Sequence, residues 1–187
     1  LLPYTTLFRS GSTVQVSEST VVRFAIELGF DGMDVAGTGY VYFENGELNK
    51  SVKISGQKGV IINDDVTISG TETEADLKST AGRFQIAAGK KLTINGDGAQ
   101  VNVLAKKGID FADNAMLAIG GSDAKVNLQA DQGNVVLGEA AGVAISGGGI
   151  NEVALSGKEA VLAKDAVIDL GSGAASSFTL QADKLTD

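Results

Sequence analysis

The 187-residue chain has no cysteine, no histidine and no tryptophan, and it holds a single proline, Pro3. Without cysteine there is no disulfide and no thiolate metal site. Without histidine the chain lacks the commonest general base near neutral pH and the commonest ligand of transition metals. A serine–histidine or cysteine–histidine mechanism is therefore excluded within these residues, and we expect a protein that is not an enzyme.

Aromatic residues are scarce at 5%, and 15 lysines and arginines stand against 23 aspartates and glutamates, which gives a formal charge of −8. An acidic surface repels nucleic acid and anionic lipid, so neither is an expected partner. No apolar run reaches the roughly 20 residues of a membrane-spanning helix, so membrane insertion is not expected in this segment. The apolar residues occur as short pieces separated by glycine, a composition typical of many short strands.

Three segments of the chain differ in character. Residues 1–10 (LLPYTTLFRS) contain the only proline and resemble translated sequencing-adaptor sequence, so we treat them as foreign or disordered. Residues 11–51 have longer apolar stretches and are expected to form irregular N-terminal coils or a cap. Residues 52–187 carry a repeat. A secretory signal and an anchoring segment are expected outside this sequence.

The repeat consists of short triplets with an apolar first and third residue. One series of triplets starts at Phe84, Val101, Leu117, Val135 and Val153. An interleaved series starts at Leu92, Ile109, Val126, Val143, Val161 and Phe178. Within each series, successive triplets start about 17 residues apart. Because side chains alternate along a strand, each triplet buries its first and third residues and exposes its second.

Triplets this short bury a core only when they stack on one another. The sequence therefore predicts an all-β, single-stack parallel β-solenoid with about 17 residues and two short strands per coil. The sequence itself does not give the handedness, but parallel crossovers prefer the right hand, so a right-handed β-helix is expected. An antiparallel sandwich is the competing architecture, but it would show strands of about 5–6 residues and no strict repeat.

Acidic turn residues are the first candidate site. With the predicted coil length, four aspartates fall in equivalent turns and are expected to form a column along one edge: Asp97, Asp113, Asp131 and Asp165. Stacked carboxylates repel one another, which favours a bound cation, and oxygen-rich turns suit calcium. A solvated row of turn-forming aspartates is the simpler interpretation. The calcium β-roll repeat G-G-x-G-x-D-x-U-x is not matched.

Two alternative functions follow from the carboxylates. A carbohydrate-active β-helix hydrolase or lyase would use a pair such as Asp110 with Asp113, or Asp64 with Asp65, for acid–base chemistry. The scarcity of aromatic residues leaves a sugar-binding cleft poorly supplied. A calcium-stabilised secreted β-roll is the other alternative.

Two surface features bear on partners. Lys90-Lys91 and Lys106-Lys107 fall one predicted coil apart and suggest a small basic ridge for an anionic glycan, although solvated turn charge explains them more simply. Towards the C-terminus the outward middle positions become apolar, and we expect a strip for self-association: Val136, Ala144, Ala154 and Leu162. Open strand edges on the end coils are a second expected site of self-association.

Short triplets joined by glycine-, asparagine- and aspartate-rich turns, from about residue 52 to residue 187, resemble the passenger regions of bacterial autotransporters and filamentous-haemagglutinin-type adhesins. The resemblance is one of pattern and rests on no diagnostic motif. It implies an extracellular or cell-surface β-helix that displays binding loops away from the cell. The expected function is a structural or adhesive segment, a rigid stalk whose partner is a protein or glycan on a host or neighbouring cell.

Overall fold

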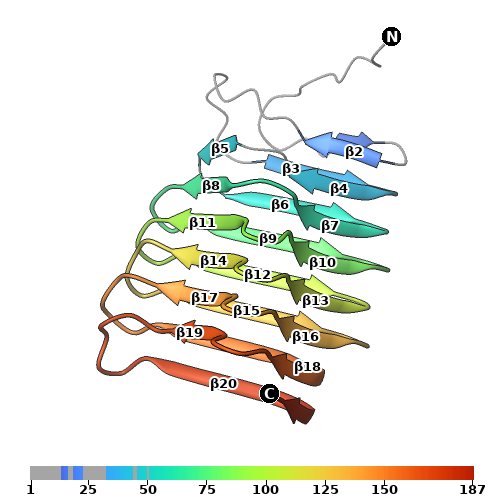
Figure 1. The fold of residues 1–187 in the computed structure, drawn as a ribbon. Coiled ribbons are helices and arrows are strands. Elements are labelled where there is room, and N and C mark those ends of the chain that lie inside the picture. Colours follow the sequence, from blue (N-terminus) through green and yellow to red (C-terminus); the bar gives the residue numbers. More distant parts are fainter. Residues whose placement is uncertain (1–13, 17–18, 23–32, 44–45, 50) are drawn as a thin grey trace.

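The protein is a parallel β-solenoid, as the sequence predicts. The computed structural model describes residues 14–16, 19–22, 33–43, 46–49 and 51–187. These residues form only strands and turns, stacked coil upon coil from the N-terminal to the C-terminal end (Figure 1). The described part contains no helix that is long and apolar enough to cross a membrane.

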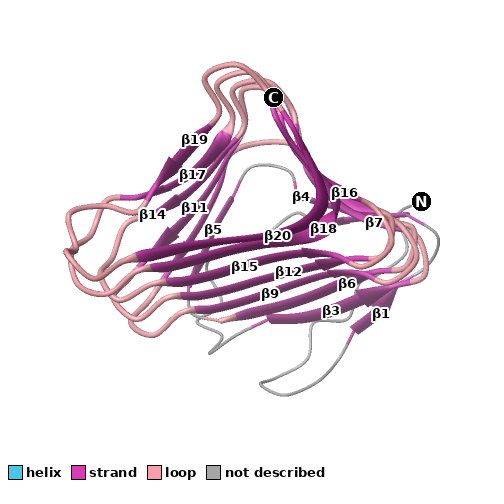
Figure 2. Ribbon diagram, turned by 90° about the horizontal axis from the view of Figure 1, so that it is seen from below, coloured by secondary structure: helices cyan, strands magenta, loops and turns pink. Residues whose placement is uncertain are grey.

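Each coil is a triangle with three strands, one on each face (Figure 2). Face 1 consists of β1 (Val14–Val16), β3 (Met33–Gly37), β6 (Val52–Gly56), β9 (Glu74–Ser79), β12 (Gln100–Ala105), β15 (Lys125–Ala130), the first half of β18 (Glu152–Leu162) and the first half of β20 (Ser177–Thr186). Face 2 consists of β2 (Ser19–Val22), β4 (Tyr40–Phe43), β7 (Gly59–Ile62), β10 (Arg83–Ile86), β13 (Gly108–Phe111), β16 (Asn134–Leu137) and the second halves of β18 and β20. Face 3 consists of β5 (Gly46–Asn49), β8 (Val66–Ser69), β11 (Lys91–Asn95), β14 (Met116–Ile119), β17 (Gly142–Ile145) and β19 (Val167–Asp169).

The predicted length of the coil, with its two strands, is wrong. Each coil has three strands and about 25 residues, the separation of Asp97 and Ser122, which are hydrogen-bonded across neighbouring coils. On face 2 the inward residues of successive coils stack in the order Val60, Phe84, Ile109, Val135 and Ala160. All three faces carry triplets with the same apolar pattern. The spacing of the triplets therefore predicts the strands but does not say how many of them make one coil.

The alternation within the triplets is confirmed except in the triplet that starts at Val161, where Ala160 and Leu162 take the inward positions and Val161 lies between them on the outer side. Inward residues of the strands from β6 to β17 are almost fully buried on all three faces and form one continuous core along the axis. Its largest side chains are Phe43, Phe84 and Phe111, and the rings of Phe84 and Phe111 lie 6.3 Å apart. No buried side-chain nitrogen or oxygen of the described residues lacks a hydrogen-bond partner. The core is therefore apolar and continuous, as stacked coils require.

Three corners join the faces. Corner A, between faces 1 and 2, consists of residues 57–58, 80–82, 106–107, 131–133 and 158. Corner B, between faces 2 and 3, consists of residues 63–65, 87–90, 112–115, 138–141 and 163–166. Corner C, between faces 3 and 1, consists of residues 70–73, 96–99, 120–124, 146–151 and 170–176.

The N-terminal strands belong to the same ladders. β1 pairs with β3, β2 pairs with β4, and β5 pairs with β8, all in parallel. The described part of residues 11–51 thus continues the solenoid. Residues 1–10 lie outside the described residues.

Corner B repeats one left-handed backbone position in four successive coils. Its φ is +66° at Gly89, +59° at Asn114, +53° at Ala140 and +58° at Asp165. Glycine and asparagine adopt this conformation readily, whereas alanine gains nothing from it and its Cβ crowds the following carbonyl. Ala140 therefore holds local strain.

We expect Ala140→Gly to raise the free energy of unfolding by about 1 kcal/mol, because glycine relieves that strain. Urea denaturation measures the change. Ala112→Gly is the control, since Ala112 lies in the same corner at an ordinary φ, and glycine there should destabilise by about 0.5–1 kcal/mol. Destabilisation of both variants to the same extent would contradict the assignment of strain to Ala140.

Candidate functional site

The four aspartates of the predicted cation column do not lie together. Asp97 is in corner C, Asp131 is in corner A, and Asp113 and Asp165 are in corner B, two coils apart. The prediction fails because the coil has three strands, so aspartates that are spaced for a two-strand coil fall in different corners. The described residues contain no cluster of three or more histidine, cysteine, aspartate or glutamate side chains that could hold a metal ion.

Several corner aspartates instead join one coil to the next. In each case a side-chain oxygen accepts a hydrogen bond from a backbone N–H about one coil further along the chain. The pairs are Asp65 with Lys91 (2.9 Å), Asp97 with Ser122 (2.8 Å), Asp113 with Glu139 (2.9 Å) and Asp123 with Ile150 (2.9 Å). Charge-assisted bonds of this kind satisfy amides that have no strand partner at the corners. The aspartate-rich turns are thus explained by coil stacking.

The carboxylate pairs considered for catalysis are also engaged in structural contacts. Asp64 forms an ion pair with Lys90 (2.7 Å). The hydrogen bond that Lys90 donates, and a second one from the backbone N–H of Asp65, lower the pKa of Asp64. Asp110 lies on the outer side of face 2 and accepts a long hydrogen bond of 3.5 Å from Gln85. Asp113 bonds to the next coil. None of these carboxylates lines the groove that is described below.

The predicted apolar strip is divided among three faces. Val136 points outward from face 2, Ala144 from face 3 and Ala154 from face 1, while Leu162 is half-buried against the core. The three-strand coil again separates residues that a two-strand coil would align. This set of residues therefore forms no continuous surface for self-association.

The C-terminal end of the solenoid exposes apolar residues. Phe178 and Leu185 of β20 are 39% and 58% exposed, whereas Val153 and Ala160, which occupy the same positions one coil earlier, are each 1% exposed. Among the described strands β20 pairs only with β18. Self-association through end coils stays a prediction, and its expected location is β20.

Corner A and the adjoining edges of faces 1 and 2 gather positive charge. Three successive coils contribute the segments 55–59, 78–83 and 104–108, which contain five cations and no acidic residue. The five are Lys58, Lys78, Arg83, Lys106 and Lys107. We call these residues the basic patch. It holds a third of the 15 cations of a chain whose formal charge is −8.

Most of the basic patch is unpaired. Lys106 forms an ion pair with Asp131 (2.7 Å), which lowers the pKa of Asp131 by its hydrogen bond and its charge. The other four cations have no carboxylate oxygen within 4.0 Å among the described residues. All four are exposed. The predicted ridge of Lys90-Lys91 with Lys106-Lys107 is wrong, because the first pair adjoins corner B and the second lies in corner A.

Close packing of the backbone sets the pattern of side chains in corner A. A Cβ atom at Gly82 would collide with the carbonyl group of Lys58, and a Cβ at Gly133 would collide with that of Lys107. Each of these lysines is therefore followed, one coil later, by a glycine. One coil further on a lysine returns: the N–H of Lys107 donates to the carbonyl of Gly82 at 2.8 Å, and the N–H of Lys158 donates to that of Gly133 at 2.9 Å. Lysines thus stand two coils apart, about 9.6 Å at a strand spacing of about 4.8 Å.

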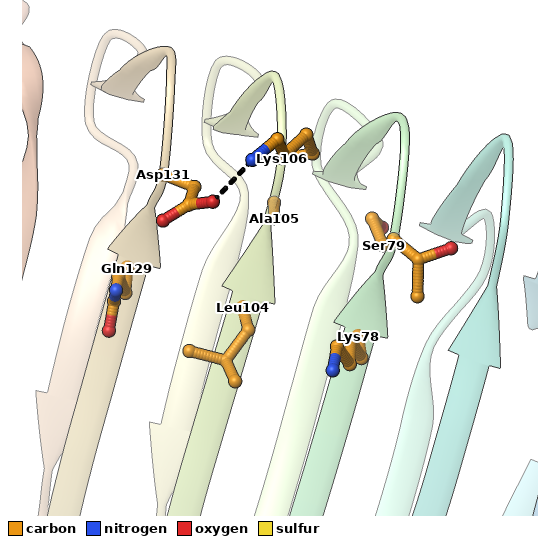
Figure 3. A pocket seen from close by; sticks show the side chains of 8 residues that line it. Lys78, Ser79, Leu104, Ala105, Lys106, Gln129 and Asp131 are labelled. Atoms are coloured by element: carbon orange, nitrogen blue, oxygen red, sulfur yellow. Dashed lines mark hydrogen bonds and ion pairs between the residues drawn. The ribbon is translucent and has the colours of Figure 1, made fainter.

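A shallow groove of 210 Å³ runs beside the basic patch on face 1 (Figure 3). Its walls are Lys78, Ser79, Thr80, Leu104, Ala105, Lys106, Gln129 and Asp131. The groove is smaller than the roughly 300–1,000 Å³ of sites that enclose a small molecule. Ammonium, hydroxyl, amide and carboxylate groups line it around the apolar side chain of Leu104.

An exposed tyrosine ring lies at the N-terminal end of the patch. Tyr40 is 38% exposed and is aligned with Gly59 and Arg83 on successive coils. The missing side chain of Gly59 makes room for the ring, since a Cβ there would lie 3.0 Å from Cδ1 of Tyr40. Arg83 reaches over Gly108, whose Cβ position lies 3.8 Å from Nη1 of the arginine. Tyr40, Lys58, Arg83 and Lys107 therefore follow one another on four coils.

Asn151 is a buried polar residue that carries no signal in the sequence. It lies in corner C, where its Oδ1 accepts a hydrogen bond from the N–H of Ala124 (2.9 Å). Its Nδ2 donates to the carbonyl oxygens of Gly147 (3.2 Å), Gly148 (3.1 Å) and Leu170 (2.9 Å). One side chain thus connects three successive coils.

We expect Asn151→Ala to lower the free energy of unfolding by about 1–3 kcal/mol, because it leaves the buried Ala124 N–H and the partly buried Leu170 carbonyl without partners. Urea denaturation measures the loss. Asn127→Ala is the control, since Asn127 points outward from face 1, and its removal should change stability by less than about 0.5 kcal/mol. Equal effects of the two substitutions would show that the buried bonds of Asn151 contribute nothing special.

Comparisons with protein-family models, with curated proteins and with solved structures give no match for this chain. A functional interpretation therefore rests on the arrangement of its own residues.

Proposed function

We propose that the chain is a structural and adhesive segment of a bacterial extracellular or cell-surface protein, in which the solenoid acts as a rigid stalk. The observation that carries the proposal is the contrast between the inside and the corners of each coil. The inward residues and the backbone ladders are the same in kind from coil to coil, whereas the side chains at corner A differ. A scaffold of this kind fixes distance and stiffness while its corners present contacts.

The axial construction suits a stalk. Every strand from β6 to β17 has a parallel partner on both sides, so no internal coil can slip without breaking many hydrogen bonds together. Aspartate side chains add bonds between coils at the corners. The backbone hydrogen bonds therefore resist bending of the solenoid, and the surface side chains are not needed for its stiffness.

Adherence of a displayed chain tests the proposal. The chain is placed on the surface of a non-adherent bacterium, and attachment to epithelial cells and to other bacteria is counted under flow. The release of reducing sugars from a panel of polysaccharides is measured in parallel. Adherence without sugar release supports the proposal.

Two outcomes contradict it. Absence of adherence to every surface would remove the adhesive function. Sugar release that disappears in Asp110→Asn or Asp113→Asn would favour the carbohydrate enzyme, because those substitutions keep the size of the side chain and remove its acid–base capacity.

A further inference from the structure

We propose that the basic patch and Tyr40 form a binding site for an acidic glycan, which lies along corner A parallel to the solenoid axis. The inference rests on the proposed adhesive function and names the class of ligand. Three features of the described residues carry it: the concentration of unpaired cations, their spacing along the axis, and the groove and ring beside them.

The charge of the patch is unusual for this molecule. Without its five cations the formal charge of the chain would be −13, from −8 for all residues. The five cations instead concentrate positive charge on three coils at one corner. Four of them have no carboxylate within 4.0 Å among the described residues, so an external anion does not have to displace an internal partner.

The spacing of the cations fits a polymer. Lys58 and Lys107 stand two coils apart, which is about 9.6 Å, and Arg83 lies on the coil between them. Extended chains that carry a charge on every sugar unit or every second unit meet such a row at regular intervals. Arginine adds directional recognition, because its guanidinium group binds a carboxylate or sulfate with two parallel hydrogen bonds.

The groove and the ring favour a glycan over other polyanions. The C–H face of a sugar ring packs against an exposed aromatic ring such as Tyr40. Thr80 and Gln129 offer a hydroxyl and an amide to sugar hydroxyls in the groove, beside the apolar surface of Leu104. The carboxylate of Asp131, which also lines the groove, is paired with Lys106. Duplex nucleic acid and a lipid surface are both wide, and the acidic remainder of the molecule would repel them.

Binding of soluble probes to the purified full chain tests the site. The probes are oligogalacturonate and chondroitin sulfate, with poly-glutamate as a polyanion without sugar rings, single-stranded oligonucleotide, and vesicles containing anionic lipid. We expect either acidic glycan to bind more tightly than the other three probes, with an affinity that falls as salt is raised.

Two sets of substitutions locate the site. Replacement of Lys58, Arg83 and Lys107 together by glutamine should weaken glycan binding about tenfold, because several exposed charge contacts of modest strength are lost at once. The matched control replaces Lys91, Lys125 and Lys164 by glutamine, which changes the net charge equally at corner B and at the corner C edge of face 1, and it should leave binding unchanged. Tyr40→Ala should weaken glycan binding and leave any poly-glutamate binding as it is. Urea denaturation confirms that each variant is folded.

The inference is overturned if neither acidic glycan binds, if both triple variants weaken binding equally, or if oligonucleotide or vesicles bind as tightly as the glycans. These results are separable from those of the adherence experiment. Adherence that survives the Lys58, Arg83 and Lys107 substitutions would overturn the glycan site alone. Glycan binding by the soluble chain, with no adherence when it is displayed, would overturn the adhesive function alone.

Discussion

Replacement of Gly147 by alanine is expected to lower the free energy of unfolding by at least about 3 kcal/mol. A Cβ atom at this position would collide with the carbonyl group of Gly121, one coil earlier in corner C. The colliding carbonyl belongs to the main chain, so no side chain can move aside to relieve the contact. The coils would have to separate, which breaks ladder hydrogen bonds on both adjoining faces.

The same requirement holds along the whole corner. One glycine of each coil stacks directly on the glycine of the coil before it, and the set consists of Gly70, Gly96, Gly121, Gly147 and Gly171. At each of the last four, a Cβ atom would meet the carbonyl group of the preceding glycine. We call this set the glycine column. Corner C turns so tightly that successive coils touch through their main chains.

The neighbouring residue provides the control. Gly148 has no left-handed φ, and the nearest atom to its Cβ position is the Oγ of Ser172 at 3.6 Å. Gly148→Ala should therefore leave stability unchanged or raise it by about 0.4–1 kcal/mol, through the lower entropy of the unfolded chain. Urea denaturation and hydrogen exchange of the flanking strands β14, β17 and β19 measure both variants. Similar stability of Gly147→Ala and Gly148→Ala would show that the coils of corner C are not in backbone contact.

The fold class could be predicted because burial leaves a local trace. In β12, Val101 and Val103 are buried while Asn102 between them is half-exposed, and the same pattern recurs in nearly every internal strand. Such alternation is visible in a triplet, whatever its partners. Parallel stacking then follows, because a strand this short has no other means to cover both its apolar side chains and its backbone.

The length of the coil could not be predicted from the triplets, since all three faces carry the same signal. The glycines, by contrast, recur with the true length of the coil. The turns that begin at Asn95, Gly120 and Ser146 occupy the same corner in three successive coils. A position that cannot carry a Cβ atom marks the coil more strictly than one that needs only an apolar side chain, because many residues satisfy the second condition.

The candidate sites depended on that length. The aspartate column and the apolar strip both required the shorter, two-strand coil, and neither exists in the three-strand coil. The basic patch is the opposite case, because Lys58, Arg83 and Lys107 have no common motif and are brought together only by the correct coil. Asn151 could not be singled out, since its importance arises from four backbone groups that the sequence does not display.

Deletion of one whole coil is expected to leave the chain folded, whereas a shorter deletion is expected to unfold it. Deletion of residues 84–108 joins Arg83 to Ile109, and in the ladder of face 2 Ile109 lies directly over Phe84. The shortened chain therefore keeps every strand on its own face, and the glycine column closes with Gly121 above Gly70.

A second, shorter deletion is the matched control. Deletion of residues 84–100 removes one coil of the length that the triplets alone predict, and it places Val101 where Phe84 was. The apolar alternation is therefore preserved. The following strands, however, move to the wrong faces, and the glycine column moves out of corner C.

Urea denaturation of these two deletion variants tests the central claim most directly. The three-strand coil predicts one cooperative transition for the 84–108 deletion, with stability lowered only by the loss of one repeat. It predicts no cooperative transition for the 84–100 deletion, although that variant loses fewer residues. A folded 84–100 variant beside an unfolded 84–108 variant would contradict the three-strand coil and the sites that depend on it.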